Sequence, residues 1–216
     1  MKPFSLLIFL ALLLGCSNDG APTAESESQA ELADADGWNK GGMATAANPH
    51  AVAAAIEMLE MGGHAVDAAI AAHTVLGLVE PQSSGLGGGG FMLVYEREEG
   101  ELTFHEGREV APSGATVDMF MIDGVVMNFF EAWQSGKSVG VPGIVALYAS
   151  AHDQHGKLEW AEVLQPAIRL ATEGFEVSPR LADFLPMMAE RSQLAKNPLT
   201  AAYFYPGGEA LQAGHL

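Results

Sequence analysis

Four consecutive glycines, Gly87–Gly90, precede an apolar run, and bare backbone of this kind can approach a phosphate group. A P-loop requires a Lys and a Ser or Thr after its last glycine, and a dinucleotide fingerprint requires a strand before the glycines and a helix after them. Here Phe91, Met92 and Leu93 follow, and the preceding pattern is helical. Both nucleotide motifs are therefore excluded. We expect the glycines either to adopt positive φ angles or to allow another segment to approach closely. The glycine segment then forms either a wall of a binding site or a tight turn without a ligand.

Arg108 is a second candidate functional residue, because a guanidinium group can bind a carboxylate through two parallel hydrogen bonds. It lies in the stretch FHEGREVAP, close to Glu106 and Glu109. From these residues alone, an ion pair with either glutamate or a solvated strand end are the alternatives to substrate binding. The chain contains 27 acidic and 10 basic residues, and its net charge of −17 argues against nucleic-acid binding.

The histidines and serines show no spacing that is typical of a metal or nucleophile site. No HExxH pattern is present, and we predict no metal site and no cofactor. Ser83 and Ser84 lie outside any G-x-S-x-G motif and have no base nearby in the sequence. The histidines are scattered at His50, His64, His73, His105, His152, His155 and His215.

The N-terminus has the layout of a secretory signal, with Lys2 followed by an apolar run and the sequence LLGC. This pattern predicts a lipoprotein signal over residues 1–15 and a lipidated Cys16, the only cysteine. The alternative is that Cys16 is a small apolar residue of a signal cleaved nearby. Residues 16–40 are acidic, contain almost no large apolar residue and predict a flexible tether. Residues 41–216 form the globular part.

The periodicity of the globular part predicts helices and one hairpin. Asn48 and Pro49 are helix start signals, and Gly62 and Gly63 end that helix. Pro166 is expected to kink or break a later helix. The fold class is therefore α+β or layered α/β. Because two strands do not form a stable sheet, we expect an N-terminal fragment of a larger protein or a chain that needs a partner. The predicted helices are 48–62, 65–80, 115–121, 142–156, 159–175 and 178–195, and the predicted strands are 91–96 and 102–109.

Several stretches occur in the order found in one known family. They are GGMATAANPHAVAAAIEMLEMGGHAVDAAIAAHTVLGLVEPQSSGLGGGGFMLVY, REVAPSGAT, SVGVPGIVAL and VLQPAIRLATEGFEVS. Together they resemble the N-terminal half of the γ-glutamyltranspeptidases, also called glutathione hydrolases. The resemblance runs from about Gly41 to the end and leaves out only the signal and the tether.

This resemblance implies an N-terminal-nucleophile hydrolase with an αββα sandwich, made as a precursor that cuts itself into a large and a small subunit. Residues 41–216 correspond to the N-terminal portion of the large subunit. In the family, the first threonine of the small subunit attacks the γ-glutamyl amide, with its own α-amine as the base. Water or an acceptor amino acid or peptide then releases the acyl group. The threonine motif is absent here, so we expect no catalytic residue in this chain and no activity from it alone.

The resemblance also implies a role for Arg108, because the arginine of the REVAP motif grips the α-carboxylate of the γ-glutamyl group. Glu109 is expected to orient it, and Gly87–Gly90 are expected to lie close to it. The implied partners are the small subunit and glutathione, and a lipid on Cys16 would anchor the protein in the bacterial periplasm. The alternatives are an acylase of cephalosporins or another dicarboxylate amide, and a non-catalytic lipid-anchored binding protein.

Overall fold

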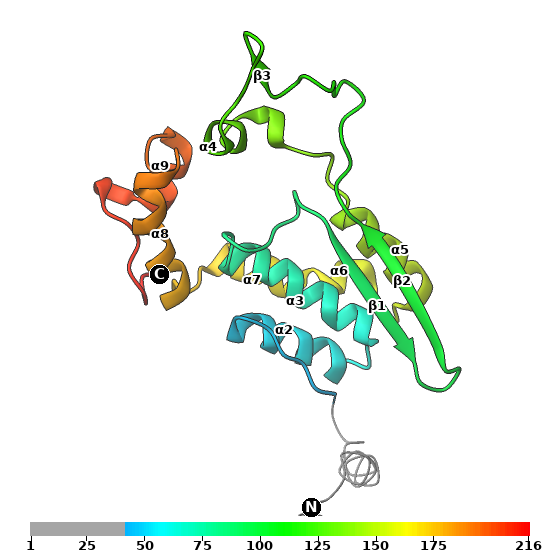
Figure 1. Cartoon of the computed structure of the whole chain (residues 1–216). Helices are drawn as coiled ribbons and strands as arrows, with labels where there is room; N and C mark the ends of the chain where they lie inside the picture. Colours follow the sequence, from blue (N-terminus) through cyan, green and yellow to red (C-terminus); the bar gives the residue numbers. More distant parts are fainter. Residues whose placement is uncertain (1–41) are drawn as a thin grey trace, which may run out of the picture. The chain divides into compact units, whose positions relative to one another are not determined.

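The computed structural model describes residues 42–216 (Figure 1). The predictions for the signal, for Cys16 and for the tether lie outside the described residues. Among the residues that are described, no helix is long and apolar enough to cross a membrane. The elements are α2 (Pro49–Glu60), α3 (Ala65–Val79), β1 (Gly90–Glu96), β2 (Glu101–Gly107), β3 (Met121–Ile122), β4 (Val125–Val126), α4 (Phe129–Trp133), the 3-10 turn η2 (Gly136–Ser138), α5 (Ile144–His155), α6 (Trp160–Val163), α7 (Gln165–Glu173), α8 (Pro179–Arg191), α9 (Pro198–Phe204) and the 3-10 turn η3 (Pro206–Gly208).

Helices α2 and α3 form a closely packed pair and lie side by side (Figure 1). The Asn48 side chain caps α2 by accepting a hydrogen bond from the His50 backbone, and Pro49 occupies the first turn. Gly62 closes the connection with a φ of 86°. Small buried side chains allow the close packing, as the alanine-rich sequence predicted. They are Ala51, Ala54, Ala55, Ala68 and Ala71.

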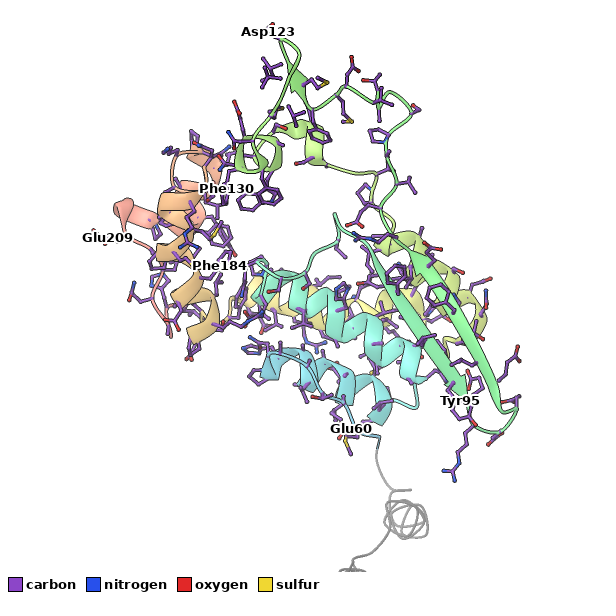
Figure 2. All side chains as sticks on the ribbon, viewed as in Figure 1. Glu60, Tyr95, Asp123, Phe130, Phe184 and Glu209 are labelled. Atoms are coloured by element: carbon purple, nitrogen blue, oxygen red, sulfur yellow. The ribbon has the colours of Figure 1, made fainter. Side chains whose placement is uncertain are left out.

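Strands β1 and β2 form the predicted antiparallel hairpin, in a register that pairs Gly90 with Gly107 and Glu96 with Glu101. Helix α5 packs against both strands. The side chain of Val94 is buried on the inner face, whereas large apolar side chains alternate on the outer face. Tyr95 marks this outer face near the turn (Figure 2). The exposed outer residues are Phe91, Leu93, Tyr95, Leu102 and Phe104.

The predicted short helix over residues 115–121 is wrong. The chain makes a turn there and continues into a second small hairpin, β3 and β4, with Asp123 at its tip (Figure 2). Asp123 and Gly124 have φ angles of 52° and 79°, which is the combination that a two-residue type I′ turn requires. The turn chemistry of Asp-Gly therefore overrides the weak helical pattern before it.

The three later helices that were predicted are present, whereas α4 and α9 were not predicted. Pro166 breaks the predicted helix into α6 and α7, because its ring cannot continue the α6 hydrogen-bond ladder but fits the first turn of α7. Ser178 caps α8 by accepting a hydrogen bond from the Leu181 backbone. The described part thus combines helices with two small sheets, which confirms the α+β class.

The described apolar core has two clusters. The larger one joins α2, α3, α5, α6 and the inner face of the first hairpin, with Met58, Ile70, Val94 and Leu147 among its buried members. The smaller one lies in the C-terminal helices, where the Tyr205 hydroxyl donates a hydrogen bond to the Leu185 carbonyl at 2.7 Å. The first hairpin is therefore held by the larger cluster.

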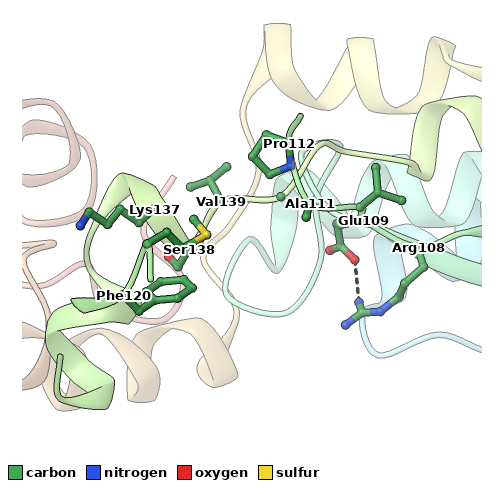
Figure 3. A pocket seen from close by; sticks show the side chains of 11 residues that line it. Arg108, Glu109, Ala111, Pro112, Phe120, Lys137, Ser138 and Val139 are labelled. Carbon is green, nitrogen blue, oxygen red and sulfur yellow. Dashed lines mark hydrogen bonds and ion pairs between the residues drawn. The ribbon is translucent and has the colours of Figure 1, made fainter. Parts of the chain in front are cut away.

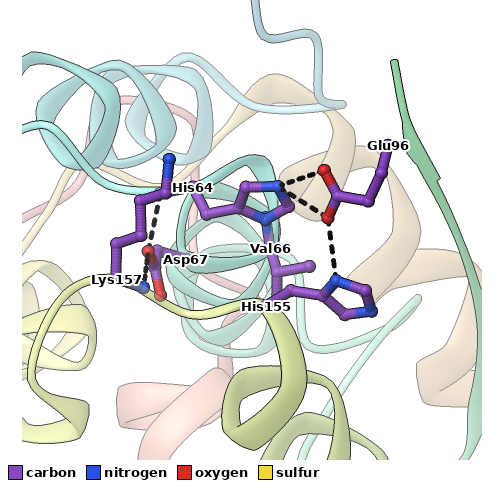
Figure 4. Close-up of polar contacts among 6 residues, drawn as sticks. All are labelled: His64, Val66, Asp67, Glu96, His155 and Lys157. Atoms are coloured by element: carbon purple, nitrogen blue, oxygen red, sulfur yellow. Dashed lines mark hydrogen bonds and ion pairs between the residues drawn. The ribbon is translucent and has the colours of Figure 1, made fainter. Parts of the chain in front are cut away.

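A polar clamp holds the turn end of the first hairpin against two helices (Figure 4). His64 Nδ1 accepts a hydrogen bond from the Val66 backbone N–H, so the neutral ring carries its proton on Nε2, which lies 3.1 Å from Glu96 Oε1. His155 Nδ1 lies 2.8 Å from the same oxygen. Partial burial alone would raise the pKa of Glu96, but the hydrogen bonds from His155 and His64 hold it below its ordinary value.

A substitution of Glu96 by Gln tests this clamp through the pH dependence of stability. A carboxyl group whose pKa is lower in the folded state stabilises the fold at pH values above its ordinary pKa of 4.5. This stabilisation disappears as the pH falls through the pKa of the folded state. At pH 6, the wild-type protein should therefore unfold at a higher urea concentration than Glu96→Gln. The difference between the two unfolding midpoints should shrink below pH 4.5. Glu99→Gln in the exposed turn is the control. A difference that stays constant down to pH 3 would contradict the clamp.

Candidate functional site

Three backbone segments meet at the other end of the hairpin and form what we name the glycine junction, residues 88–90, 107–109 and 140–144. The Gly88 carbonyl accepts hydrogen bonds from the N–H groups of Gly143, at 3.1 Å, and Ile144, at 3.2 Å. A bridge between Val110 and Val141 continues the contact. The junction therefore ties the loop after α3 and the end of β2 to the start of α5.

The junction leaves no room for side chains at four of its glycines, Gly89, Gly107, Gly140 and Gly143. A Cβ atom on Gly89 would lie 2.5 Å from the Gly107 carbonyl oxygen and 2.8 Å from the Glu109 nitrogen, and one on Gly140 would lie 2.9 Å from Glu109 Cβ. None of the residues Gly87–Gly90 has a positive φ angle. The positive-φ interpretation is therefore wrong, and close approach of another segment explains Gly89, whereas Gly87 and Gly88 have room for a Cβ atom.

Arg108 leaves the junction directly after β2 and points its guanidinium to the surface. Its side chain is 62% exposed, and Nη1 donates a hydrogen bond to Glu109 Oε2 at 2.6 Å (Figure 3). Of the two glutamates that the sequence offered as partners, the structure pairs Arg108 with Glu109. The Glu109 side chain is half-buried against Gly89 and Gly140, so the more buried carboxylate holds the exposed guanidinium beside the junction.

A pocket of about 360 Å³ lies beside this ion pair. Its lining comes from residues 108–112 at the end of β2, from Met119 and Phe120, and from residues 137–140. Figure 3 shows Arg108 and Glu109 at one side of the pocket and Phe120 and Lys137 at the other. A cationic group beside apolar walls suits a small ligand that carries a carboxylate.

The sequence missed part of this site. Gly107, Gly140 and Gly143 carry as much of the close packing as Gly89 does. The available signal was a glycine inside the predicted strand, at Gly107, and two glycines around the predicted helix start, at Gly140 and Gly143. Ser83 Oγ accepts a hydrogen bond from Arg180, a group that cannot act as a general base. Among residues 42–216, no three His, Cys, Asp or Glu side chains are arranged to hold a metal ion.

Comparison with known proteins identifies the family. The family model described as Gamma-glutamyltranspeptidase matches residues 51–216. The chain belongs to the γ-glutamyltranspeptidase family. Among curated relatives, the glutathione hydrolase proenzyme of Bacillus subtilis is 38% identical over 177 residues, and Scoloptoxin SSD14 of Scolopendra dehaani is 43% identical over 147 residues. These alignments cover 81% and 68% of this chain but only 30% and 24% of the relatives, so the chain spans about a third or less of their length.

A solved structure supports the same assignment. The γ-glutamyltranspeptidase of Helicobacter pylori is 33% identical and superposes with a TM-score of 0.76, covering 82% of this chain and 50% of that chain. The described residues of this γ-glutamyltranspeptidase family member therefore contain part of the N-terminal-nucleophile hydrolase fold, in the large-subunit region. Both the family and the fold that the motifs indicated are confirmed.

The glycine junction predicts a position-specific effect of adding one methyl group. Gly89→Ala should destabilise the protein by about 1 to 3 kcal/mol, because the Cβ atom overlaps backbone atoms of Gly107 and Glu109. Gly87→Ala is the matched control. Nothing lies within 4 Å of its Cβ position, so this variant should be neutral or gain up to about 1 kcal/mol. Urea denaturation measures both, and equal effects of the two substitutions would contradict the junction.

Proposed function

We propose that the full-length protein cleaves γ-glutamyl amides such as glutathione and transfers the γ-glutamyl group to water, an amino acid or a peptide. The single observation that carries the proposal is Arg108 beside a small pocket in a member of the γ-glutamyltranspeptidase family. The acyl group would be carried by a threonine that lies outside these 216 residues. The precursor would cut itself before that threonine, which then becomes the first residue of the small subunit.

Arg108 would bind the α-carboxylate of the γ-glutamyl donor. A guanidinium has five N–H donors, and the single hydrogen bond to Glu109 leaves others for a substrate carboxylate. The half-buried Glu109 fixes the direction of the guanidinium and lowers the entropy cost of binding. The described chain thus supplies the recognition of substrate charge, and the acyl-transfer chemistry belongs to the rest of the protein.

The outer face of the first hairpin supports the proposal of a partner subunit. Its five large apolar side chains are exposed, and a two-stranded hairpin is marginal by itself. We propose that the small subunit completes the αββα sandwich over this face, where two sheets would pack about 10 Å apart.

For location, we propose that residues 1–15 act as a lipoprotein signal and that a lipid on Cys16 anchors the protein in the bacterial periplasm. The apolar run before LLGC supports this proposal. Residues 16–40 would then hold the enzyme at a distance from the membrane.

An acylase that cleaves cephalosporins or another dicarboxylate amide is the weaker candidate, because the family model and the Bacillus subtilis relative carry the names of γ-glutamyltranspeptidase and glutathione hydrolase. The other alternative is a binding protein that kept the fold and lost the nucleophile. The downstream coding sequence separates this alternative from the enzymes, because only the enzymes need the threonine motif.

Arg108→Ala in the full-length enzyme tests the substrate contact. Loss of a charged hydrogen-bonding partner costs roughly 2 to 5 kcal/mol, so the KM for a γ-glutamyl anilide should rise at least about thirtyfold. Arg97→Ala, at the turn end of the same hairpin, is the control and should leave KM unchanged. Steady-state kinetics provide the measurement, and an unchanged KM in Arg108→Ala would refute the assignment.

Cys16→Ser tests the anchor. Wild type should sediment with membranes and carry a lipid on its N-terminal cysteine, whereas Cys16→Ser should remain in the soluble fraction. Ser17→Ala, the neighbouring substitution, controls for changes to the signal region. Mass spectrometry of the mature N-terminus decides the question, because an unmodified wild-type N-terminus would end the lipoprotein proposal.

A further inference from the structure

We propose that Glu80 is a positioning residue that sets the glycine junction and, through it, the Arg108 guanidinium; this inference rests on the proposed function. Glu80 directly follows α3, and only 1% of its surface is exposed. Its carboxylate accepts hydrogen bonds from Asn48 Nδ2 at 2.8 Å and from Gln82 Nε2 at 2.6 Å. Arg180 Nη1 lies 3.7 Å away.

The surroundings keep Glu80 ionised. Burial alone would raise its pKa, but hydrogen bonds from Asn48 and Gln82 and the charge of Arg180 lower the pKa below its ordinary value. A buried carboxylate is nevertheless a poor way to stabilise a fold, because its desolvation offsets most of the attraction. The network of Glu80 with Asn48, Gln82 and Arg180 therefore points to a role in fixing the position of the chain at this point.

The network fixes the beginning of the loop that leads to the junction. The Ser83 N–H donates to the Glu80 carbonyl at 3.0 Å, and Arg180 Nη2 donates to Ser83 Oγ at 2.8 Å. Asn48 is the cap of α2, and Arg180 lies in the first turn of α8. The loop thus starts from a point that is tied to three helices.

The rest of the loop is held by backbone packing. Gly85 lies against α3, where a Cβ atom on Gly77 would be 3.2 Å from Gly85 Cα. The Gly88 N–H then donates to the Gly85 carbonyl at 3.3 Å, and Gly89 forms the wall behind Glu109. Since Glu109 holds the guanidinium, a shift of the loop start displaces the substrate-binding group.

The test is Glu80→Gln in the full-length enzyme. The Gln side chain has the same shape, but its amide nitrogen cannot accept a hydrogen bond where one carboxylate oxygen accepts from Asn48 or Gln82. The start of the loop should therefore loosen. We expect the KM for a γ-glutamyl anilide to rise about tenfold while kcat changes less than about twofold, as for lost substrate positioning. Hydrogen exchange of residues 84–90 should become faster, and exchange in α2 and α3 should stay the same.

Two further variants keep the test decisive. Arg180→Gln alters the 54% exposed partner and should reproduce the rise in KM even if Glu80→Gln fails to fold. Glu57→Gln breaks the exposed pair with Arg169 and should leave KM unchanged. If the wild type is active, two results overturn the positioning role alone. One is an unchanged KM in Arg180→Gln, and the other is faster hydrogen exchange throughout α2 and α3 in Glu80→Gln. An inactive wild type with its threonine motif intact overturns the proposed function as well.

Discussion

The arrangement of this protein depends on one constraint, the close approach of three backbone segments at the glycine junction. The Gly88 carbonyl binds the start of α5, and Gly89 lies against the end of β2. The contact at Gly89 requires the absence of a side chain, so the chain segment that carries Arg108 is placed by close approach of backbone atoms. The site therefore gains precision from residues that make no contact with a ligand.

The hairpin that carries Arg108 is held at both of its ends by different interactions. Near the turn, Glu96 bridges His64 at the start of α3 and His155 at the end of α5. At the other end, the junction uses hydrogen bonds between uncharged backbone groups. Acid therefore weakens the first attachment and leaves the second unchanged. The inner face packs on the core between these attachments, and the apolar outer face is exposed.

The sequence predicted those features that depend on local signals. Asn48 with Pro49 marked a helix start, and Pro166 marked a break. The Asp123-Gly124 turn was not predicted, although Asp-Gly between apolar residues is a strong hairpin signal. For Arg108, the residues alone left an ion pair and substrate binding open, and only the resemblance favoured substrate binding, since the two look alike in sequence. The pocket joins residues 108–112 to residues 137–140, and no local pattern contains such a contact.

The ion pair at Arg108 is suited to exchange with a substrate. In a chain with a net charge of −17, an exposed guanidinium without a fixed neighbour would sample many acidic partners. Glu109 competes with those partners because its half-buried side chain packs beside Gly89 and Gly140, next to the guanidinium. An exposed pair of this kind contributes at most about 1 kcal/mol, so a substrate carboxylate can share or displace it at little cost. The contact with Glu109 thus gives the Arg108 guanidinium a preferred direction. Because the pair is weak, the guanidinium can still bind another carboxylate.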